Sequence, residues 1–295
     1  MRPEEIASRL KNYSCRTGKK LTKERGALKE RYTITGDIIS YSLCPRQYGL
    51  YRYYGFAPSN PSQEWFGSVI HRFLKRVHAI YRVKGRLVRP GEVEPIFAQI
   101  EISMEAEGTR PSSPQVREKV VEILRVFTQS LARELVPKIV EAELRLVKEL
   151  PTFILYGVVD ALKAEGEEFE VWDYKGMERP DPSDPFGRKK LEVYTRQMFV
   201  YAYLFKEKNG SYPKKAVLLF MNELLKGADG EPFLEIDFTD LKVVKQVEEF
   251  IKEFARIVEK IEKSKENGVW ELPEEIDRWT CLQCDFRHDC PRFAS

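Results

Sequence analysis

The stretch Val159–Lys175, VDALKAEGEEFEVWDYK, decides how this chain folds. Two apolar runs typical of strands, Phe153–Lys163 and Phe169–Lys175, stand on either side of the polar segment AEGEE. Gly166 lies in the middle of that segment, where a glycine between two strand-like runs favours a tight turn. The pattern therefore predicts a β-hairpin.

The predicted hairpin brings two acids together. A turn centred just after Gly166 places Asp160 opposite Asp173, and opposed residues on one face have Cβ atoms about 5 Å apart. Lys175 follows two residues after Asp173 and therefore projects from the same face. Two carboxylates at this spacing can share a divalent cation, and the ammonium beside them suits metal-assisted hydrolysis of a phosphodiester. The alternative is a structural salt bridge among apolar neighbours.

The composition bounds the class of protein. The 295 residues suffice for one large domain or two small ones, and 42% of them are hydrophobic, enough for a sizeable core. The net charge of +3 is weakly basic, so any surface that binds nucleic acid must be local. No apolar run reaches about eighteen residues, as a membrane span requires, and residues 1–14 lack the apolar centre of a signal peptide. We therefore expect a cytoplasmic protein.

The rest of the chain alternates between helix-like and strand-like patterns. The continuously apolar run Lys215–Met221 is typical of a central strand. We expect a long loop over residues 176–190, which contain three prolines and two glycines. Helices are predicted within Thr35–Phe56 (capped by Thr35 and broken at Pro45), at Ser62–Val83, after Ser113, at Leu191–Lys208 and from Asp240 to about Ser264; further strands are predicted at Ile139–Leu150 and Phe233–Phe238.

Two of these helices carry candidate site residues. His71 lies on the amphipathic helix Ser62–Val83, where a histidine is usually structural unless the neighbouring acids require a further ligand. Gln197 and Tyr201 are four residues apart and share a helix face. Core packing explains the tyrosine, but it explains the polar Gln197 less well. Glu143 is expected to be a surface acid.

The C-terminal tail contains a metal-binding pattern. In a protein of a reducing compartment, three cysteines in ten residues favour metal ligation over disulfides. A tetrahedral thiolate site needs a fourth ligand, and Cys44 is expected to supply it because a proline follows it as Pro291 follows Cys290. His288 competes for that place, and zinc is the simpler metal for such a site. Cys15 is expected to be a bystander. The tail cysteines have the spacing C-x2-C-x5-C: Cys281, Cys284 and Cys290.

Two further segments are rich in groups that suit nucleic acid. Residues 1–33 carry a basic stretch that can contact phosphates, although a run of charges is usually a solvated segment. Tyrosines and arginines interleave over residues 46–54, a combination that suits stacking on bases or packing beneath a cofactor equally.

Taken together, these residues resemble the RecB-like branch of the PD-(D/E)xK nucleases, and more narrowly its iron–sulfur exonucleases, which include the CRISPR-associated ones. The resemblance covers roughly Ile34–Pro291, and no catalytic position of the family is missing. The matching motifs are the metal histidine His71 in GSVIHRFL, the GxxD motif Gly157–Asp160, the (D/E)xK motif Asp173–Lys175, the QxxxY motif Gln197–Tyr201 and the cluster cysteines Cys44, Cys281, Cys284 and Cys290.

The resemblance implies an α/β fold with a restriction-endonuclease-like core, in which helices flank a mixed sheet, together with helical additions and a C-terminal iron–sulfur segment. It makes residues 34–295 the nuclease domain and residues 1–33 a basic N-terminal extension. It also implies a 4Fe-4S cluster on the four cysteines. The Mg²⁺ or Mn²⁺ ligands that it implies are His71, Asp160, Asp173 and the Tyr174 carbonyl.

The function that the resemblance implies is a metal-dependent DNA exonuclease that acts mainly on single strands, in CRISPR adaptation or DNA repair. Lys175 would be catalytic together with Asp160 and Asp173, and Gln197 and Tyr201 would position the DNA. The expected partners are DNA and CRISPR integrase proteins or a repair helicase, with no membrane involved. The alternative is a non-catalytic DNA-binding partner of a helicase or integrase complex, in which the metal cluster is structural.

Overall fold

The structure, a computed structural model, describes residues 29–56, 61–273, 278–282 and 284–293. The chain divides into two compact units, which we describe separately. The smaller unit combines residues 1–59, 147–156 and 249–295, and the larger unit combines residues 60–146 and 157–248. Most of the basic N-terminal stretch and Cys15 lie outside the described residues.

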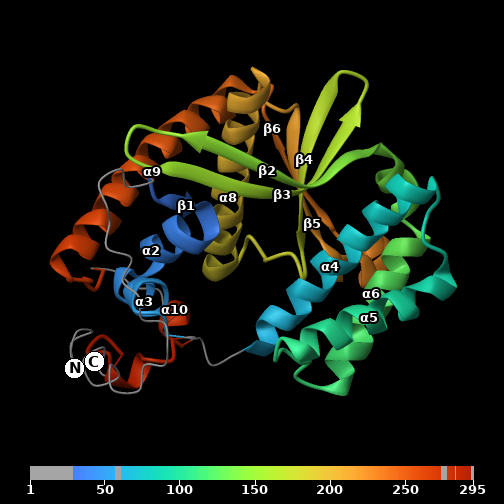
Figure 1. The fold of residues 1–295 in the computed structure, drawn as a ribbon, viewed down its shortest axis with the longest axis horizontal. Coiled ribbons are helices and arrows are strands. Elements are labelled where there is room, and N and C mark those ends of the chain that lie inside the picture. Colours follow the sequence, from blue (N-terminus) through green and yellow to red (C-terminus); the bar gives the residue numbers. More distant parts are fainter. Residues whose placement is uncertain (1–28, 57–60, 274–277, 283, 294–295) are drawn as a thin grey trace. The chain divides into compact units, whose positions relative to one another are not determined.

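The elements of the described chain are labelled in Figure 1. The strands are β1 (Arg31–Thr33), β2 (Ile139–Glu149), β3 (Ile154–Glu165), β4 (Glu168–Lys175), β5 (Lys215–Phe220) and β6 (Phe233–Asp237). The α-helices are α2 (Ser40–Leu43), α3 (Pro45–Tyr48), α4 (Pro61–Lys84), α5 (Val93–Ala106), α6 (Pro114–Gln129), α7 (Ala132–Leu135), α8 (Pro185–Asn209), α9 (Leu241–Asn267) and α10 (Arg278–Leu282). Short 3-10 or π-helical segments are Ile34–Ile39, Gly49–Tyr53, Pro90–Glu92, Val136–Lys138, Met221–Asp229 and Arg287–Asp289.

Strands β3 and β4 form the predicted hairpin. They pair antiparallel from Glu165 opposite Glu168 to Ala161 opposite Trp172, around a two-residue turn. One further step along this register brings Asp160 opposite Asp173. The prediction of the hairpin and of its register is therefore confirmed.

The hairpin belongs to a mixed sheet. In the larger unit, β4 pairs parallel with β5, and β5 pairs antiparallel with β6. Because β5 has a neighbour on each side and is buried from Ala216 onward, the prediction of a central strand is confirmed. Strand β2 pairs with β3. In the smaller unit, β1 runs parallel to the first residues of β3.

Helices α4, α5 and α6 cover one face of this sheet. Figure 1 shows them beside one another, in cyan to green. The apolar stripe of α4, which includes Trp65, Val69, Phe73 and Val77, is fully buried in a core that also contains Trp172 of β4. The predicted helix after Ser113 is present, and the Ser113 hydroxyl accepts a hydrogen bond from the N–H of Val116, as an N-cap does. Helix α5 was not predicted.

Helix α8 lies against the other face of the sheet. The rings of Phe169 in β4 and Phe205 in α8 are 5.6 Å apart. The helix begins at Pro185, so the predicted start at Leu191 was wrong. The reason is a local cap: the Asp184 carboxylate accepts a hydrogen bond of 2.8 Å from the N–H of Gly187, and a proline is tolerated in the first helical turn.

The smaller unit packs the Cys44 region against the end of α9 and Trp270. Its first helical segment begins at Ile34, so the prediction of a cap at Thr35 was wrong. Instead, the buried Asp37 accepts hydrogen bonds of 2.8 Å from both the N–H and the hydroxyl of Thr33. Pro45 separates α2 from α3, as predicted, and Cys44 stands at the break.

Among the described residues, no helix combines the length and the apolar character that crossing a membrane requires.

Candidate active site

A close backbone approach between α4 and the end of β4 brings a histidine to the hairpin. A Cβ at Gly176 would lie 3.1 Å from the Cα of Gly67, so glycine at position 176 lets the helix come this near. His71 follows Gly67 by one helical turn. Its Nδ1 lies 3.1 Å from Oδ1 of Asp160. The structure therefore brings His71 and Asp160, two of the predicted metal ligands, into contact.

The Asp160 carboxylate also holds the end of the hairpin. Its Oδ2 accepts a hydrogen bond of 2.7 Å from the backbone N–H of Tyr174. The carboxylate therefore satisfies a main-chain donor just beyond Trp172, where the described pairing of the two strands ends. Asp160 thus links α4 to β4, with one oxygen directed to each.

Asp173 lies in the centre of the site and is only 3% exposed. Its Oδ1 accepts a hydrogen bond of 2.9 Å from the side-chain amide of Gln197. Its Oδ2 forms an ion pair of 2.7 Å with the ammonium of Lys175, but this oxygen accepts no hydrogen bond of good geometry from the part of the chain that the structure describes. The same ammonium donates to Oε1 of Gln197 at 2.8 Å. The three side chains form a closed triangle.

The polar Gln197 is explained by this triangle, because core packing alone gives a buried amide no partners. Its Nε2 also donates to the Tyr201 hydroxyl at 2.9 Å, so the two residues of the QxxxY motif contact each other on one face of α8. Gly157, the first residue of the GxxD motif, leaves room for the Tyr201 ring: a Cβ there would lie 3.0 Å from that ring and 3.2 Å from Leu204.

Gly157→Ala is expected to lower both stability and any activity of the site. The added methyl group must push Tyr201 or Leu204 aside, and overpacking of a core commonly costs about 1–3 kcal/mol. The shift weakens the contact between Tyr201 and Gln197. Thermal melting measured beside activity tests this. Gly91→Ala is the matched control, because a Cβ at Gly91 meets nothing within 4 Å; equal melting temperatures of the two variants would contradict the packing argument.

Tyr194 is part of the site although the sequence did not single it out from core aromatics. Its ring centroid lies 4.6 Å from the Lys175 ammonium, and its hydroxyl donates to the sulfur of Met177 at 2.9 Å. An aromatic face stabilises a cation at such a distance. Its position three residues before Gln197, on the same helix face, was the signal that could have identified it.

The electrostatics of the site follow from burial and from the paired acids. Burial raises the pKa of Asp173; the ammonium of Lys175 acts against this shift, and the charge of Asp160 adds to it. Burial lowers the pKa of His71, but the hydrogen bond and the charge of Asp160 outweigh it, so the net shift is upward. Two close carboxylates repel each other, which is the condition that a divalent cation relieves.

Two further titratable side chains near the hairpin lie outside this site. His78 is buried, and its Nε2 lies 3.1 Å from the hydroxyl of Tyr174. Burial lowers the pKa of His78 to about 4, so it remains neutral and structural near neutral pH. Glu143 forms an ion pair of 3.3 Å with Lys75 at the surface, which confirms the expectation of a surface acid.

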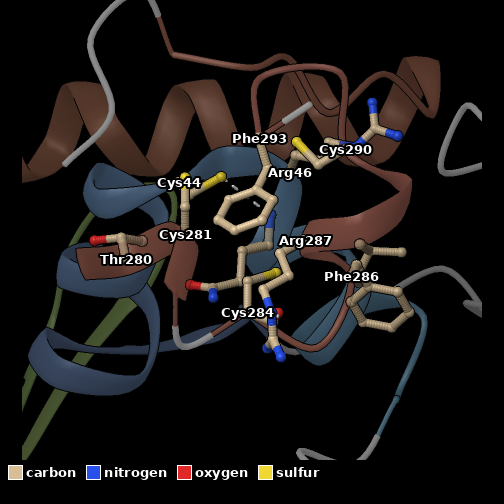
Figure 2. A pocket seen from close by; sticks show the side chains of 11 residues that line it. Cys44, Arg46, Thr280, Cys281, Cys284, Phe286, Arg287, Cys290 and Phe293 are labelled. Carbon is tan, nitrogen blue, oxygen red and sulfur yellow. Dashed lines mark hydrogen bonds between the residues drawn. The ribbon is translucent and has the colours of Figure 1, made fainter. Parts of the chain in front are cut away.

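The four predicted cluster cysteines line a single pocket in the smaller unit (Figure 2). None of the four forms a disulfide, and Cys44 is buried, while the three tail cysteines are partly exposed. The Sγ of Cys44 accepts a hydrogen bond of 3.4 Å from the N–H of Gln47. The cavity measures about 20 Å³, and Phe286, Arg287 and Phe293 also line it. The structure therefore brings Cys44 together with the three tail cysteines.

Contacts between protein groups hold the tail beside Cys44. The Tyr51 hydroxyl donates to Oδ2 of Asp285 at 2.7 Å and accepts from the Asp285 N–H at 3.1 Å. The Tyr51 ring lies 5.6 Å from that of Phe286. Burial raises the pKa of the Cys44 thiol to about 11, and the pKa of Cys284 is also raised by burial. The thiols of Cys44 and Cys284 are therefore protonated near neutral pH unless a metal replaces the protons.

Among the residues described, no three His, Cys, Asp or Glu side chains are arranged so that they could hold one metal ion as they stand. In the hairpin site, the physical reason is visible: Lys175 and Gln197 occupy the oxygens of Asp173. That His71, Asp160, Asp173 and the Tyr174 carbonyl bind a metal therefore stays a prediction, as does metal binding by the cysteines.

One comparison with known proteins identifies a nuclease family. The family described as the PD-(D/E)XK nuclease superfamily matches residues 37–291. The protein in the crystal structure of a "Putative exonuclease" from Eubacterium rectale shares 13% sequence identity with this chain. The match covers 92% of this chain and 94% of the Eubacterium rectale chain, with a TM-score of 0.51. The protein in the crystal structure of SSO0001 shares 16% sequence identity with this chain. The match covers 98% of this chain and 95% of the SSO0001 chain, with a TM-score of 0.40. No curated protein matches the sequence.

Proposed function

Because the chain belongs to the PD-(D/E)XK nuclease superfamily, we propose that it is a metal-dependent DNA exonuclease that acts mainly on single strands. The observation that carries the proposal is the cluster around Asp173, in which two acids, a lysine and a glutamine from three elements meet. The name of the Eubacterium rectale protein supports the exonuclease assignment.

The acids and His71 fit a hard divalent cation. Mg²⁺ and Mn²⁺ prefer carboxylate and carbonyl oxygens, and imidazole is an accepted further ligand. Oδ2 of Asp173 is buried and pairs with the ammonium of Lys175 at 2.7 Å, so a bound cation would take the place of this positive charge. His71, Asp160, Asp173 and the Tyr174 carbonyl would hold the ion. When bound, it would lower the pKa of a water molecule and screen the charge of the phosphate.

The remaining residues of the site would act on the attacking water and on the DNA strand. Lys175, whose ammonium Gln197 and Tyr194 hold in place, would orient the attacking water and stabilise the negative charge that develops on the phosphate. Gln197 would help to position the DNA strand beside Lys175. Tyr201 fixes the side chain of Gln197 by a hydrogen bond of 2.9 Å, and so would set its direction.

The four thiols fit a metal centre of their own. They line one pocket although Cys44 is more than two hundred residues before the tail, and their chemistry suits a soft, thiolate-bound metal. The proposal assigns them a 4Fe-4S cluster, following the resemblance to iron–sulfur exonucleases, with a single zinc ion as the competing occupant. When bound, the cluster would join the Cys44 region to the tail.

The wider role follows from the same resemblance. The proposal takes residues 34–295 as the nuclease domain and residues 1–33 as a basic extension. It places the protein in the cytoplasm, in CRISPR adaptation or DNA repair, beside integrase proteins or a helicase. The second function, a non-catalytic DNA-binding partner with a structural cluster, is less favoured because the chain retains Asp160, Asp173 and Lys175 in mutual reach.

Single-stranded DNA labelled at one end tests the proposal. The purified chain is expected to release labelled nucleotides in the presence of Mn²⁺ and to release none in EDTA. Labels at the 5′ and 3′ ends in separate reactions give the polarity, and a circular single strand detects endonuclease cuts. Binding of the linear strand without cleavage in Mn²⁺ would favour the non-catalytic partner instead.

A further inference from the structure

The active-site face of α8 continues beyond the catalytic cluster to a lysine. Lys190 precedes Gln197 by seven residues, almost two full turns at 3.6 residues per turn, so both side chains leave the helix in nearly the same direction. Tyr194, whose ring lies at the Lys175 ammonium, stands between them. Lys190 is therefore on the face of α8 that forms the site, about 10 Å along the helix axis from Gln197.

Lys190 differs from other partly buried cations of the larger unit. Lys163 pairs with Glu170 at 3.1 Å, Lys175 with Asp173 at 2.7 Å and Arg179 with Glu231 at 2.8 Å. In the described part of the chain, no carboxylate lies within the 4.0 Å of an ion pair from the ammonium of Lys190, and its described neighbour is the ring of Phe186 at 5.8 Å. Burial lowers the pKa of Lys190.

A half-buried ammonium without an anion carries an unfavourable desolvation cost. A ligand that supplies a negative charge offsets this cost. The site next to Lys190 is one that would act on a phosphodiester. The chemistry that matches the position is a phosphate oxygen, which accepts a strong hydrogen bond from an ammonium.

We propose that Lys190 binds a backbone phosphate of the nucleic-acid strand, within a few nucleotides of the bond that is cleaved. This inference rests on the proposed function, since it names a subsite of the same strand. The subsite reads no base, because an ammonium recognises the phosphate as a charge and not the sequence. Lys190 would hold the DNA strand in place while Lys175 acts on the phosphate of the bond that is cleaved.

Lys190→Gln tests the subsite, with Lys189→Gln as its matched control. Both variants lose one positive charge at neighbouring positions, but Lys189 is exposed and leaves the helix about 80° away from the direction of Gln197, whereas Lys190 leaves it about 20° away. Binding of a fluorescent single strand is measured by anisotropy in EDTA over a series of salt concentrations, and melting temperatures are measured on the same samples.

For Lys190→Gln, we expect the Kd to rise about tenfold at low salt, the effect of losing one charge-assisted hydrogen bond. The slope of log Kd against log salt should fall by about 0.7, the value for one phosphate contact on a single strand. Lys190→Arg should restore both. The melting temperature should not fall, because the substitution removes a half-buried charge.

Equal Kd values and slopes for Lys190→Gln and Lys189→Gln would overturn the subsite, and cleavage by the wild-type chain would leave the proposed function standing. A reduced slope in Lys190→Gln, with no cleavage by the wild-type chain in Mn²⁺, would support the subsite and remove the proposed catalysis. A melting temperature that falls with Lys190→Gln, at an unchanged slope, would show a structural role and overturn the inference.

Discussion

Asp173→Asn is expected to abolish DNA cleavage, by on the order of 10³-fold or more, which is the scale of effect for a group that stabilises charge in a reaction. The substitution removes the carboxylate that would hold the cation, but its amide keeps the shape of the side chain. The carbonyl oxygen of the new amide can still accept the hydrogen bond of Gln197 or contact Lys175. Cleavage in Mn²⁺ and the melting temperature, measured on the same samples, separate catalysis from folding.

The structure makes a second substitution at this position informative. Asp173→Ala leaves the ammonium of Lys175, which is 15% exposed at its side chain, without its carboxylate. Breaking a buried pair in this way costs about 3–5 kcal/mol, so this variant should melt earlier than Asp173→Asn. Full cleavage by either variant would refute the catalytic role. Loss of cleavage together with folding in both would favour the structural salt bridge.

Two further substitutions separate the roles of the residues around Asp173. Asp160→Asn should also abolish cleavage, because Asp160 links His71 to the hairpin. Lys175→Ala should remove nearly all cleavage but leave Mn²⁺ binding largely intact, since an ammonium is not a metal ligand. Titration of Mn²⁺ by calorimetry checks this difference. Weak Mn²⁺ binding by Lys175→Ala would show that the lysine shapes the cation site instead of acting on the water.

Cys44→Ala is expected to remove the metal centre of the smaller unit. Protein purified without oxygen should be brown and contain iron and sulfide near four per chain, and the variant should lose both. The binding energy of a structural metal contributes directly to folding, so the melting temperature should fall by on the order of 10 °C. Iron and sulfide content, visible absorbance and thermal melting measure the effect.

Cys15→Ser is the matched control for this experiment. Cys15 lies outside the described residues and has no neighbouring cysteine in the sequence, so iron content should be unchanged. Loss of iron in Cys15→Ser would show that the fourth ligand was wrongly chosen. A colourless wild-type protein that contains one zinc ion would replace the iron–sulfur cluster by a zinc site.

The hairpin and its register were available from the sequence because they are set locally. Alternation of apolar and polar residues fixes which side chains share a face, and a glycine in a polar turn fixes where the strands reverse. Asp160 and Asp173 are only thirteen residues apart, so this short-range pattern alone brings them together. For the same reason the caps at Ser113 and the break at Pro45 could be predicted from neighbouring residues.

The tertiary structure alone decided which distant groups reach the hairpin. No local pattern states that Gly176 lets α4 approach β4, or that Asp160 divides its oxygens between His71 and the backbone of Tyr174. The approach of α8 to the sheet, which brings the Tyr194 ring to the ammonium of Lys175, likewise depends on packing. Side-chain contacts between segments far apart in the chain are selected by shape and burial, and one sequence read without its fold contains no direct record of them.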